Sequence, residues 1–469
     1  MTKPIVFLSN FQPFITRNIL NSGVFDYLSS QAHVVIFVPK KNEKYFKELY
    51  QKDNSSTGSG QVIVEGVDIG HLVRSRKNKL FIRISDWLLD TNFLRFRKIE
   101  NLEKTGNKIR YYFSLIFTQL FSKVTPFKRF IRYLDNRINN PRPFELFFNK
   151  YKPSLVFATD IFSDYDLLLL KNARSFGVKT VAMVRSWDNT TSVGYLRFAP
   201  DALIVHNEIM KEEMQKYHNI NGKTVRISGI PQFEKYLEME PTPRDEFYRK
   251  IGADPSKRLV LFSPAGNWFI DTDWQTCQIL KDLYSEKKIP QDIQFIIRLH
   301  PFLPADLSRF EPDRNFIIDI TGPAPSNPAL NTKTKGELDK DFLQHLFDSL
   351  HYSSLVINTM SSIIIDAAAL DKSLITINFN GWEKPEEVPF LKSLPRRWRL
   401  EENQISWMSF GMTPLVRNKE ELAKWINRYL ENPSLDRDKR KLFKNAYCWK
   451  FDGKSKERIV NFLLERLNH

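Results

Sequence analysis

The sequence predicts an α/β protein with two domains, each built on a parallel β-sheet. Short apolar runs alternate with stretches of helical periodicity along most of the 469 residues, a pattern typical of parallel strands covered by helices. With 42% hydrophobic and 26% charged residues, the composition excludes a disordered or fibrous chain. Two cysteines, Cys277 and Cys448, are too few for a disulfide framework or a cysteine zinc site, so we expect a reducing compartment.

The first predicted domain spans residues 1–237. Its apolar runs predict strands at 4–9, 33–38, 154–159, 180–184, 202–205 and 225–228. The helical periodicity between them predicts helices at 19–30, 164–176 and 208–217. Asn207 is a suitable N-cap for the last of these helices, because its side chain can accept a backbone N–H of the first turn.

A charged, proline-rich segment, residues 238–256, is expected to be the linker to a second domain at 257–436. Strands are predicted there at 259–263, 293–299, 316–320, 355–358 and 374–378, and helices at 274–287, 340–351 and 420–431. Residues 437–469 are expected to form a C-terminal helix that returns to the first domain. The Pro- and Asn-rich stretch 321–336 is long enough for a loop to suggest a functional role.

The net charge of +16 is concentrated in one place. Residues 74–142 hold 17 Lys or Arg against 5 acids, a net charge of +12, within a predicted helical insert at about 72–150. Apolar residues recur at helical spacing on both sides of Pro126: Ile109, Phe113, Ile116, Phe117, Leu120, Phe121 and Val124, then Phe127, Phe130, Ile131, Leu134 and Ile138.

Two interpretations of this insert stay open. Its apolar stripes either pack on their own domain, or form a basic amphipathic surface that contacts anionic lipid. Nucleic acid is a poor candidate partner, because no zinc-finger, RRM-like or KH-like motif accompanies the charge. No leader peptide and no apolar run of about 18 residues is evident, so we expect a cytoplasmic protein, soluble or peripheral on the inner face of the plasma membrane.

Two segments carry the candidate chemistry of the second domain. Arg298, His300 and Pro301 follow one predicted strand, and Ser361 and Ser362 open a helix after another. Because ligands of open α/β sheets bind outside the carboxyl ends of strands, these side chains could hold a phosphate group from two sides. Each feature alone also has a structural explanation, since serine often caps a helix and a His-Pro pair often ends a strand.

These motifs resemble the GT-B superfamily of bacterial polysaccharide enzymes. The resemblance rests on RLHP (298–301), on NTMSSIIIDAAALDKSLITI (358–377), on RISGIPQF (226–233), and on DGKSKER (452–458). It covers residues 150–469 well, and residues 40–150 match no pattern of that superfamily. The resemblance implies a GT-B-like fold, in which two Rossmann-like, doubly wound domains face a cleft.

The resemblance also implies a nucleotide donor in the second domain. Arg298, His300, Ser361 and Ser362 would then contact the donor phosphate. Asp366 would either face the ligand or serve packing, and Gly266 would either let backbone approach the ligand or form a plain turn. No metal or cofactor is expected, because such enzymes hold the diphosphate with helix dipoles and basic groups, and Asp271 and Asp273 are interpreted as part of a loop.

The acceptor and the catalytic base are expected in the first domain. A transfer by direct attack needs a group that takes the proton of the acceptor hydroxyl. Asp160 and Asp188 are the favoured candidates among the acids at strand ends, and Arg17 is a candidate for binding an anionic acceptor or phosphate. The competing interpretation is that these aspartates cap the helices that follow them.

The leading functional prediction is a nucleotide-sugar glycosyltransferase of the Leloir type. It would act on a saccharide, lipid-linked or polymeric acceptor in the synthesis of a capsule, a lipopolysaccharide or a similar surface polysaccharide. The alternative is a CDP-glycerol-type polyol-phosphate transferase. A sugar-nucleotide 2-epimerase is less favoured, because a soluble sugar nucleotide needs no basic insert.

Overall fold

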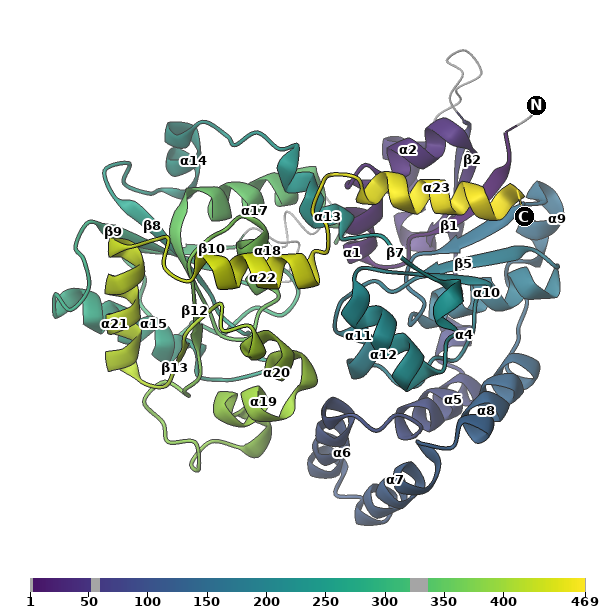
Figure 1. Ribbon diagram of the computed structural model, residues 1–469, viewed down its shortest axis with the longest axis horizontal. Coiled ribbons are helices and arrows are strands. Elements are labelled where there is room, and N and C mark those ends of the chain that lie inside the picture. Colours follow the sequence, from purple (N-terminus) through teal and green to yellow (C-terminus); the bar gives the residue numbers. More distant parts are fainter. Residues whose placement is uncertain (1–2, 52–59, 321–335, 469) are drawn as a thin grey trace. The chain divides into compact units, whose positions relative to one another are not determined.

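The computed structural model describes residues 3–51, 60–320 and 336–468 (Figure 1). The chain divides into two compact units: unit 1 comprises Met1–Lys235 and Trp449–His469, and unit 2 comprises Tyr236–Cys448. The suspected functional loop at 321–336 lies, except for Gly336, outside the described residues. No helix in the described part of the chain has the length and apolar character needed to cross a membrane.

Unit 1 contains a parallel seven-stranded sheet in the order β3-β2-β1-β4-β5-β6-β7. The strands are β1 (Ile5–Ser9), β2 (His33–Pro39), β3 (Val62–Val67), β4 (Leu155–Ala158), β5 (Lys179–Met183), β6 (Ala202–Val205) and β7 (Val225–Ile227). In register, Val6 lies beside Val34 of β2 and Leu155 of β4. The strand order reverses between β1 and β4, which is where ligands of such sheets bind.

Helices cover both faces of this sheet because the strand residues are apolar on both sides. Val6 and Leu8 of β1 pack with one set of helices, and Phe7 packs with the other. The helices and helical turns are α1 (Pro13–Ile15), η1 (Thr16–Leu20), α2 (Val24–Gln31), η2 (Lys40–Asn42), α3 (Glu43–Tyr50), α9 (Glu145–Tyr151), α10 (Asp164–Ser175), α11 (Asn189–Ser192), α12 (Glu208–His218), η3 (Gly222–Thr224), α13 (Pro231–Glu234) and α23 (Ser455–Asn468).

The predicted insert is helical and belongs to unit 1. It consists of α4 (Gly70–Val73), α5 (Arg76–Trp87), α6 (Asn92–Thr105), α7 (Lys108–Phe121) and α8 (Thr125–Ile138). Pro126 stands in the first turn of α8, where its missing N–H costs no hydrogen bond.

Unit 2 contains a parallel six-stranded sheet in the order β10-β9-β8-β11-β12-β13. The strands are β8 (Arg258–Ser263), β9 (Ile293–Arg298), β10 (Phe316–Asp319), β11 (Ser353–Asn358), β12 (Leu374–Ile377) and β13 (Leu415–Val416). The helices and the helical turn are α14 (Arg244–Ile251), α15 (Asp273–Ser285), α17 (Lys340–Tyr352), α18 (Ile363–Ala369), η5 (Phe390–Lys392), α19 (Leu394–Leu400), α20 (Glu402–Ser409), α21 (Lys419–Glu431) and α22 (Arg437–Tyr447). The turn η4 (Lys235–Leu237) lies where the two units join.

Two segments differ from the boundaries expected from sequence. Residues 238–256, expected to be a linker, lie within unit 2, where Phe247 and Tyr248 of α14 are buried against Leu259. Residues 437–469 do not act as one segment. Helix α22 belongs to unit 2, whereas α23 lies alongside α2 in unit 1 (Figure 1).

Candidate functional site

The candidate donor residues of unit 2 come from three adjacent strands. Strand β8 pairs with β9 on one side and with β11 on the other, and all three are parallel. Their carboxyl ends therefore share one edge of the sheet, with the ends of β9 and β11 about 10 Å apart. The strand order reverses between β8 and β11, so the sequences after these strands lie at the expected ligand position.

His300 is oriented at this edge by its own loop. Its Nδ1 accepts the backbone N–H groups of Phe302 at 3.1 Å and Leu303 at 3.0 Å. Nδ1 therefore carries no proton, and the neutral ring carries its proton on Nε2. The half-buried imidazole is thus fixed in the tautomer that can donate a hydrogen bond from Nε2 to a phosphate oxygen.

Ser361 and Ser362 lie at the matching edge position after β11. Ser361 is half-buried, and its hydroxyl accepts the N–H of Ile363 at 3.4 Å. Ser362 is exposed and makes no side-chain cap to α18, although it stands directly before that helix. The capping explanation therefore fits Ser361, whereas the Ser362 hydroxyl is presented to solvent.

Position 266 requires a glycine because of its backbone conformation and the closeness of a neighbouring backbone segment. It has a φ of +87°, and a Cβ built there would lie 2.1 Å from the carbonyl oxygen of Leu303. This contact joins the loop after β8 to the loop that holds His300. Gly266 therefore permits the close approach of these two loops and supports the loop that holds His300.

Asp273 anchors the same loop. Its buried carboxylate accepts the N–H groups of Ala265 at 3.2 Å and Gly266 at 2.8 Å. Burial raises the pKa of Asp273 to about 7, against the opposing effect of these two hydrogen bonds. Asp271 pairs with Lys392 at 3.0 Å and precedes α15, whereas Asp273, interpreted from the sequence as part of a loop, is the first residue of that helix.

Arg298, which the resemblance assigned to the donor phosphate, lies in a buried ion pair. Its guanidinium is buried and donates to Asp319 at 2.8 Å, and Asp319 also contacts Nε2 of His345 at 3.1 Å. Burial alone would raise the pKa of Asp319, but the charge of Arg298 and the contact with His345 hold it below its usual value. Arg298 therefore joins β9, β10 and α17.

Asp366 is likewise buried and hydrogen-bonded within unit 2. The side chain is 4% exposed and accepts a hydrogen bond from the Tyr236 hydroxyl at 2.6 Å. The carboxylate is therefore directed into the protein, and α18 is tied to the turn η4 through this bond.

In unit 1, Asp160 lies where sequence predicted, directly after β4, but it is fully engaged. It is 2% exposed, its Oδ2 accepts Nε of Arg185 at 2.7 Å, and its Oδ1 accepts the N–H of Phe162 at 3.2 Å. A carboxylate held in a buried ion pair is poorly suited to take a proton from an acceptor. Its placement fits a residue that positions Arg185.

Asp188 is the better placed of the two predicted bases. It follows β5, is half-buried, and receives two serine hydroxyls, that of Ser186 on Oδ1 at 2.5 Å and that of Ser192 on Oδ2 at 3.0 Å. No side-chain cap from Asp188 to α11 is formed, so the capping interpretation does not apply. The serines orient the carboxylate without neutralising its charge.

Asp166 is a notable carboxylate that the sequence did not indicate. It is buried, and Oδ1 accepts the Ser9 hydroxyl and the N–H of Asp160, so it joins the ends of β1 and β4. Burial and the nearby charge of Asp160 raise the pKa of Asp166 to about 7. Its sequence signal is weak, because Asp166 stands inside an apparent helix start, beside Ser163 and Asp164.

The raised pKa of Asp166 predicts a pH-dependent effect of Asp166→Asn. A carboxyl whose folded pKa exceeds its unfolded value of about 3.9 adds stability at low pH, and that stability is lost as pH rises through 7. Asparagine can accept the same two hydrogen bonds without titrating. The unfolding free energy of the variant minus that of the unchanged protein should therefore rise by about 2 to 3 kcal/mol from pH 5 to pH 8.

Urea unfolding of both proteins at the two pH values measures this difference. His218→Gln should change in the opposite direction, because burial lowers the pKa of His218 to about 3. The stability linked to that histidine is present above its unfolded pKa of about 6.5 and lost as pH falls. If the difference in unfolding free energy between Asp166→Asn and the unchanged protein is the same at both pH values, Asp166 is not the titrating group.

Arg17 lies in the turn η1, after β1. Its Nε donates to Oδ1 of Asn18 at 3.0 Å, and its guanidinium carbon lies 5.6 Å from the centroid of the half-buried Phe14 ring. Arg185 lies 5.5 Å from the same ring. Arg17 and Arg185 therefore both contact the Phe14 ring at the carboxyl edge of the unit 1 sheet, and Arg185 also pairs with Asp160.

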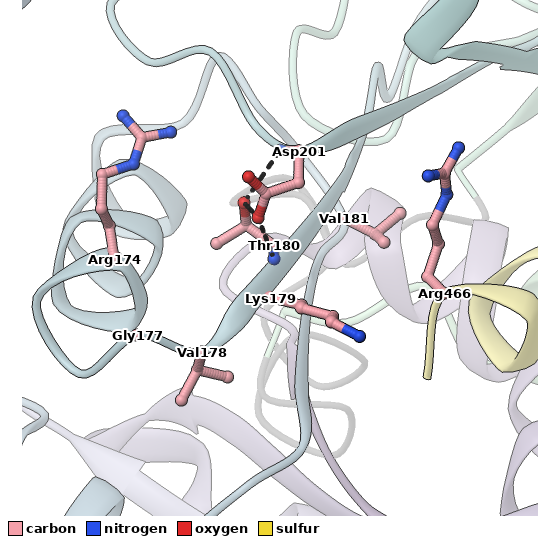
Figure 2. Close-up of a pocket in the computed structure, with 8 residues that line it drawn as sticks. All are labelled: Arg174, Gly177, Val178, Lys179, Thr180, Val181, Asp201 and Arg466. Atoms are coloured by element: carbon pink, nitrogen blue, oxygen red, sulfur yellow. Dashed lines mark hydrogen bonds between the residues drawn. The ribbon is translucent and has the colours of Figure 1, made fainter. Parts of the chain in front are cut away.

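A cavity of about 440 Å³ lies at the opposite edge of the unit 1 sheet (Figure 2). It surrounds the start of β5, where Asp201 accepts the N–H and the hydroxyl of Thr180, both at 2.8 Å. Arg174 and Arg466 stand in the last turns of α10 and α23, where they complement the carbonyl ends of these helices. The cavity is therefore distinct from the edge that carries the predicted site residues.

The insert buries only part of its apolar stripe. In α7 the polar side chains Ser114 and Thr118 are buried, while Ile109 is 85% exposed and Phe113, Ile116 and Leu120 are each more than half exposed. Phe117 and Phe121 instead pack against Trp87 of α5 and Phe127 of α8. One part of the apolar stripe therefore packs internally, and the other forms an exposed apolar face.

The basic residues of α8 are divided in the same way. Lys128 is buried and donates to the carbonyl of Tyr217 at 2.8 Å, and burial lowers the pKa of Lys128 to about 8. Arg132 donates to the carbonyls of Leu196 at 2.8 Å and His218 at 2.7 Å. Arg129 and Arg137 are exposed beside exposed Phe130 and Ile138. Only part of the positive charge of the insert is therefore exposed.

Among residues 3–51, 60–320 and 336–468, no group of three or more His, Cys, Asp or Glu side chains is arranged to hold a metal ion. The side chains that could carry the chemistry are His300 and Ser362 in unit 2, and Asp188, Arg17 and Arg185 in unit 1. Each set lies at the carboxyl edge of its own sheet.

Comparison with solved structures confirms the predicted GT-B-like fold class. The UDP-GlcNAc 2-epimerase from Neisseria meningitidis, solved with UDP-GlcNAc, is 10% identical, with a TM-score of 0.53 over 98% of this chain and 100% of that chain. The wall teichoic acid polymerase TagF is 12% identical, with a TM-score of 0.50 over 99% of this chain and 89% of that chain. At these identities the likeness establishes the fold alone.

Sequence comparison is more specific. The teichoic acid glycerol-phosphate primase of Bacillus spizizenii is 22% identical over 184 residues, which are 38% of this chain and 40% of that protein. A family model described as CDP-Glycerol:Poly(glycerophosphate) glycerophosphotransferase matches residues 179–385 and 401–465, more than half of the chain. The matched residues include Asp188, His300, Ser361 and Ser362, and the chain belongs to this CDP-glycerol:poly(glycerophosphate) glycerophosphotransferase family.

Proposed function

We propose that the protein transfers glycerol phosphate, or a related polyol phosphate, from a CDP-linked donor to a lipid-linked or polymeric acceptor of a bacterial surface polymer. Family membership carries this proposal. Family membership favours polyol-phosphate transfer, which the sequence left open as the alternative to sugar transfer. Both reactions use a donor activated by a nucleoside diphosphate. A poly(glycerophosphate) chain of the teichoic acid type is the acceptor class that the family description supports.

In the proposed reaction the acceptor hydroxyl oxygen attacks the phosphorus that bears the glycerol. A new phosphorus–oxygen bond forms, the bond to the bridging oxygen breaks, and CMP leaves with that oxygen. Asp188 takes the proton of the attacking hydroxyl. His300 and the Ser362 hydroxyl donate hydrogen bonds to the phosphate oxygens, where negative charge develops as the bond to CMP breaks.

Release of CMP from CDP-glycerol tests this function. With a glycerol-phosphate oligomer as acceptor, we expect CMP to appear in proportion to the glycerol phosphate added to the oligomer. UDP-GlcNAc and CMP-activated sugars serve as donor controls. Turnover of one of these in place of CDP-glycerol would contradict phosphate transfer and return the assignment to sugar transfer.

We further propose that α7 and α8 hold the protein at the inner face of the plasma membrane. The support is the exposed apolar face of α7 beside exposed basic residues, a combination that binds anionic bilayers. Burying a half-exposed isoleucine contributes roughly 1 kcal/mol, so the double variant Ile109→Ser/Ile116→Ser should bind vesicles at least about tenfold more weakly.

Co-sedimentation with vesicles of phosphatidylglycerol and phosphatidylcholine measures this binding, and vesicles of phosphatidylcholine alone measure its dependence on charge. Leu146→Ser is a matched control, because Leu146 is 80% exposed but lies on α9, outside the insert helices. Equal binding by the double variant and the control would contradict membrane docking through α7.

A further inference from the structure

We infer that Arg17, Arg185 and Phe14 form an anion site in unit 1 that binds a phosphate group of the acceptor. The inference rests on the proposed function and names the acceptor end that the enzyme would recognise: a phosphorylated glycerol rather than a neutral hydroxyl compound. Arg185 and Phe14 are not indicated by the sequence motifs, and only the folded chain brings them to Arg17.

The three side chains come from two segments at the carboxyl edge of the sheet, since Phe14 lies in α1, Arg17 in η1 and Arg185 after β5. Phe14 and Arg17 follow β1, and Arg185 follows β5. The guanidinium carbons of the two arginines lie 5.6 and 5.5 Å from the centroid of the Phe14 ring. The ring therefore holds both cations by cation–π contact, and both stand close to the β1–β4 reversal point of the sheet.

Acidic side chains neutralise only part of the positive charge of Arg17 and Arg185. Asp160 neutralises Arg185 through a 2.7 Å bond to Nε, which leaves the terminal amino groups of that fork to other acceptors. Arg17 has a neutral partner, Oδ1 of Asn18, and no carboxylate pairs with it in the part of the chain that the structure describes. One positive charge is thus left over where two guanidinium groups share a ring.

Partial burial strengthens the preference for an anion. The Arg185 side chain is 20% exposed and Asp160 is 2% exposed, so the pair is partly removed from water while Arg185 remains reachable. Guanidinium groups bind phosphate oxygens through two parallel N–H bonds, which gives orientation as well as affinity. A phosphate on the acceptor would be held by such bonds, in the same unit as the proposed base Asp188.

Binding of sn-glycerol 3-phosphate, measured by isothermal titration calorimetry without nucleotide, tests the site. The unchanged protein should bind this compound and not glycerol. Arg17→Gln should weaken binding by about tenfold or more, as expected for loss of a hydrogen bond to a charged group. Arg17→Lys should keep more affinity than Arg17→Gln, because it retains the charge.

Arg226→Gln is the control, because Arg226 also lies over an aromatic ring, 4.8 Å from the Phe462 centroid, but its charge is paired with a carboxylate, Glu465 at 2.9 Å. Its binding should equal that of the unchanged protein. Arg185→Lys supplies a second variant that keeps Asp160 paired. Equal affinity in Arg17→Gln and Arg226→Gln would overturn the site, and binding of inorganic phosphate but not glycerol 3-phosphate would overturn the acceptor assignment.

Failure of this inference can be told apart from failure of the proposed function. Nucleotide binding to unit 2 is measured separately and should be unchanged in Arg17→Gln. If CDP does not bind while glycerol 3-phosphate binding still depends on Arg17, the donor assignment fails and the anion site stands. If CDP binds and Arg17→Gln has no effect on glycerol 3-phosphate, only the anion site fails.

Discussion

Replacing Asp188 with asparagine is expected to slow phosphate transfer by a factor of about 10² to 10⁴, the usual contribution of a positioned general base. Asparagine preserves the shape of the side chain and can accept one serine hydroxyl, but it cannot take a proton. The donor KM should change little, because the proposed donor contacts come from His300 and Ser362. Initial rates of CMP release over a range of CDP-glycerol concentrations separate kcat from KM.

Asp160→Asn is the decisive comparison, because sequence alone favoured both aspartates. Asp160 lies in a buried ion pair with Arg185, so its replacement should affect stability and acceptor binding more than the chemical step. A nearly unchanged kcat for Asp188→Asn, together with a large loss for Asp160→Asn, would assign the base to Asp160 and contradict the role given to Asp188.

Asp135→Ala is expected to lower the unfolding free energy of unit 1 by about 3 to 5 kcal/mol, the cost of leaving buried charges without their partner. Asp135 of α8 is 1% exposed and binds two cations. Its Oδ1 accepts Nζ of Lys171 at 2.9 Å, and its Oδ2 accepts Nε of Arg197 at 2.7 Å. Arg197 also reaches Asp164 at 2.6 Å, so the network joins the insert to the start of α10.

Chemical denaturation measures this loss, and Asp135→Asn provides a milder variant that keeps hydrogen bonds but removes the charge. Glu100→Ala is the control on the same insert, because Glu100 pairs at the surface with Lys104, which is 61% exposed. Such a pair contributes at most about 1 kcal/mol. A loss for Asp135→Ala as small as that of Glu100→Ala would show that the network does not attach the insert to unit 1.

Much of the fold could be predicted because the central strands are continuous apolar runs. Strand β3 was not predicted, since Glu65 and Gly66 interrupt its sequence VIVEGV at the edge of the sheet. Strand β13 has only two residues, Leu415 and Val416, and is too short to carry a periodicity. Both missed strands lie at sheet edges. An edge strand pairs with only one neighbouring strand and is less buried, so its sequence needs fewer apolar residues.

The residues of the candidate site could be predicted from sequence only where their place at the end of a strand determines where they lie in the fold. The positions of His300 and Ser362 follow from the ends of adjacent parallel strands. The roles of Arg298 and Asp366 depend on Asp319 and Tyr236, whose proximity arises from tertiary packing and leaves no local pattern. Periodicity likewise revealed the apolar stripe of α7 but not which face is buried.

The buried face of α7 is decided by polar contacts that sequence does not show. Thr118 donates to the carbonyl of Trp87 at 2.8 Å and accepts a hydrogen bond from Nζ of Lys98 at 2.5 Å. Satisfying the Lys98 ammonium in the interior of the insert turns the Thr118 face inward. Part of the apolar stripe, including Ile109 and Ile116, is left toward solvent as a result.

We propose that the edge of the unit 2 sheet around His300 binds the donor nucleotide. Thermal unfolding of the protein and of His300→Ala, each with CDP, CMP, UDP, GDP or dTDP at about 100 times a trial dissociation constant, tests it most directly. A bound nucleotide at that concentration adds about 2.7 kcal/mol and raises the midpoint by several degrees. We predict a rise with CDP that disappears in His300→Ala, whereas no rise with any nucleotide, or an equal rise in the variant, would contradict the donor site.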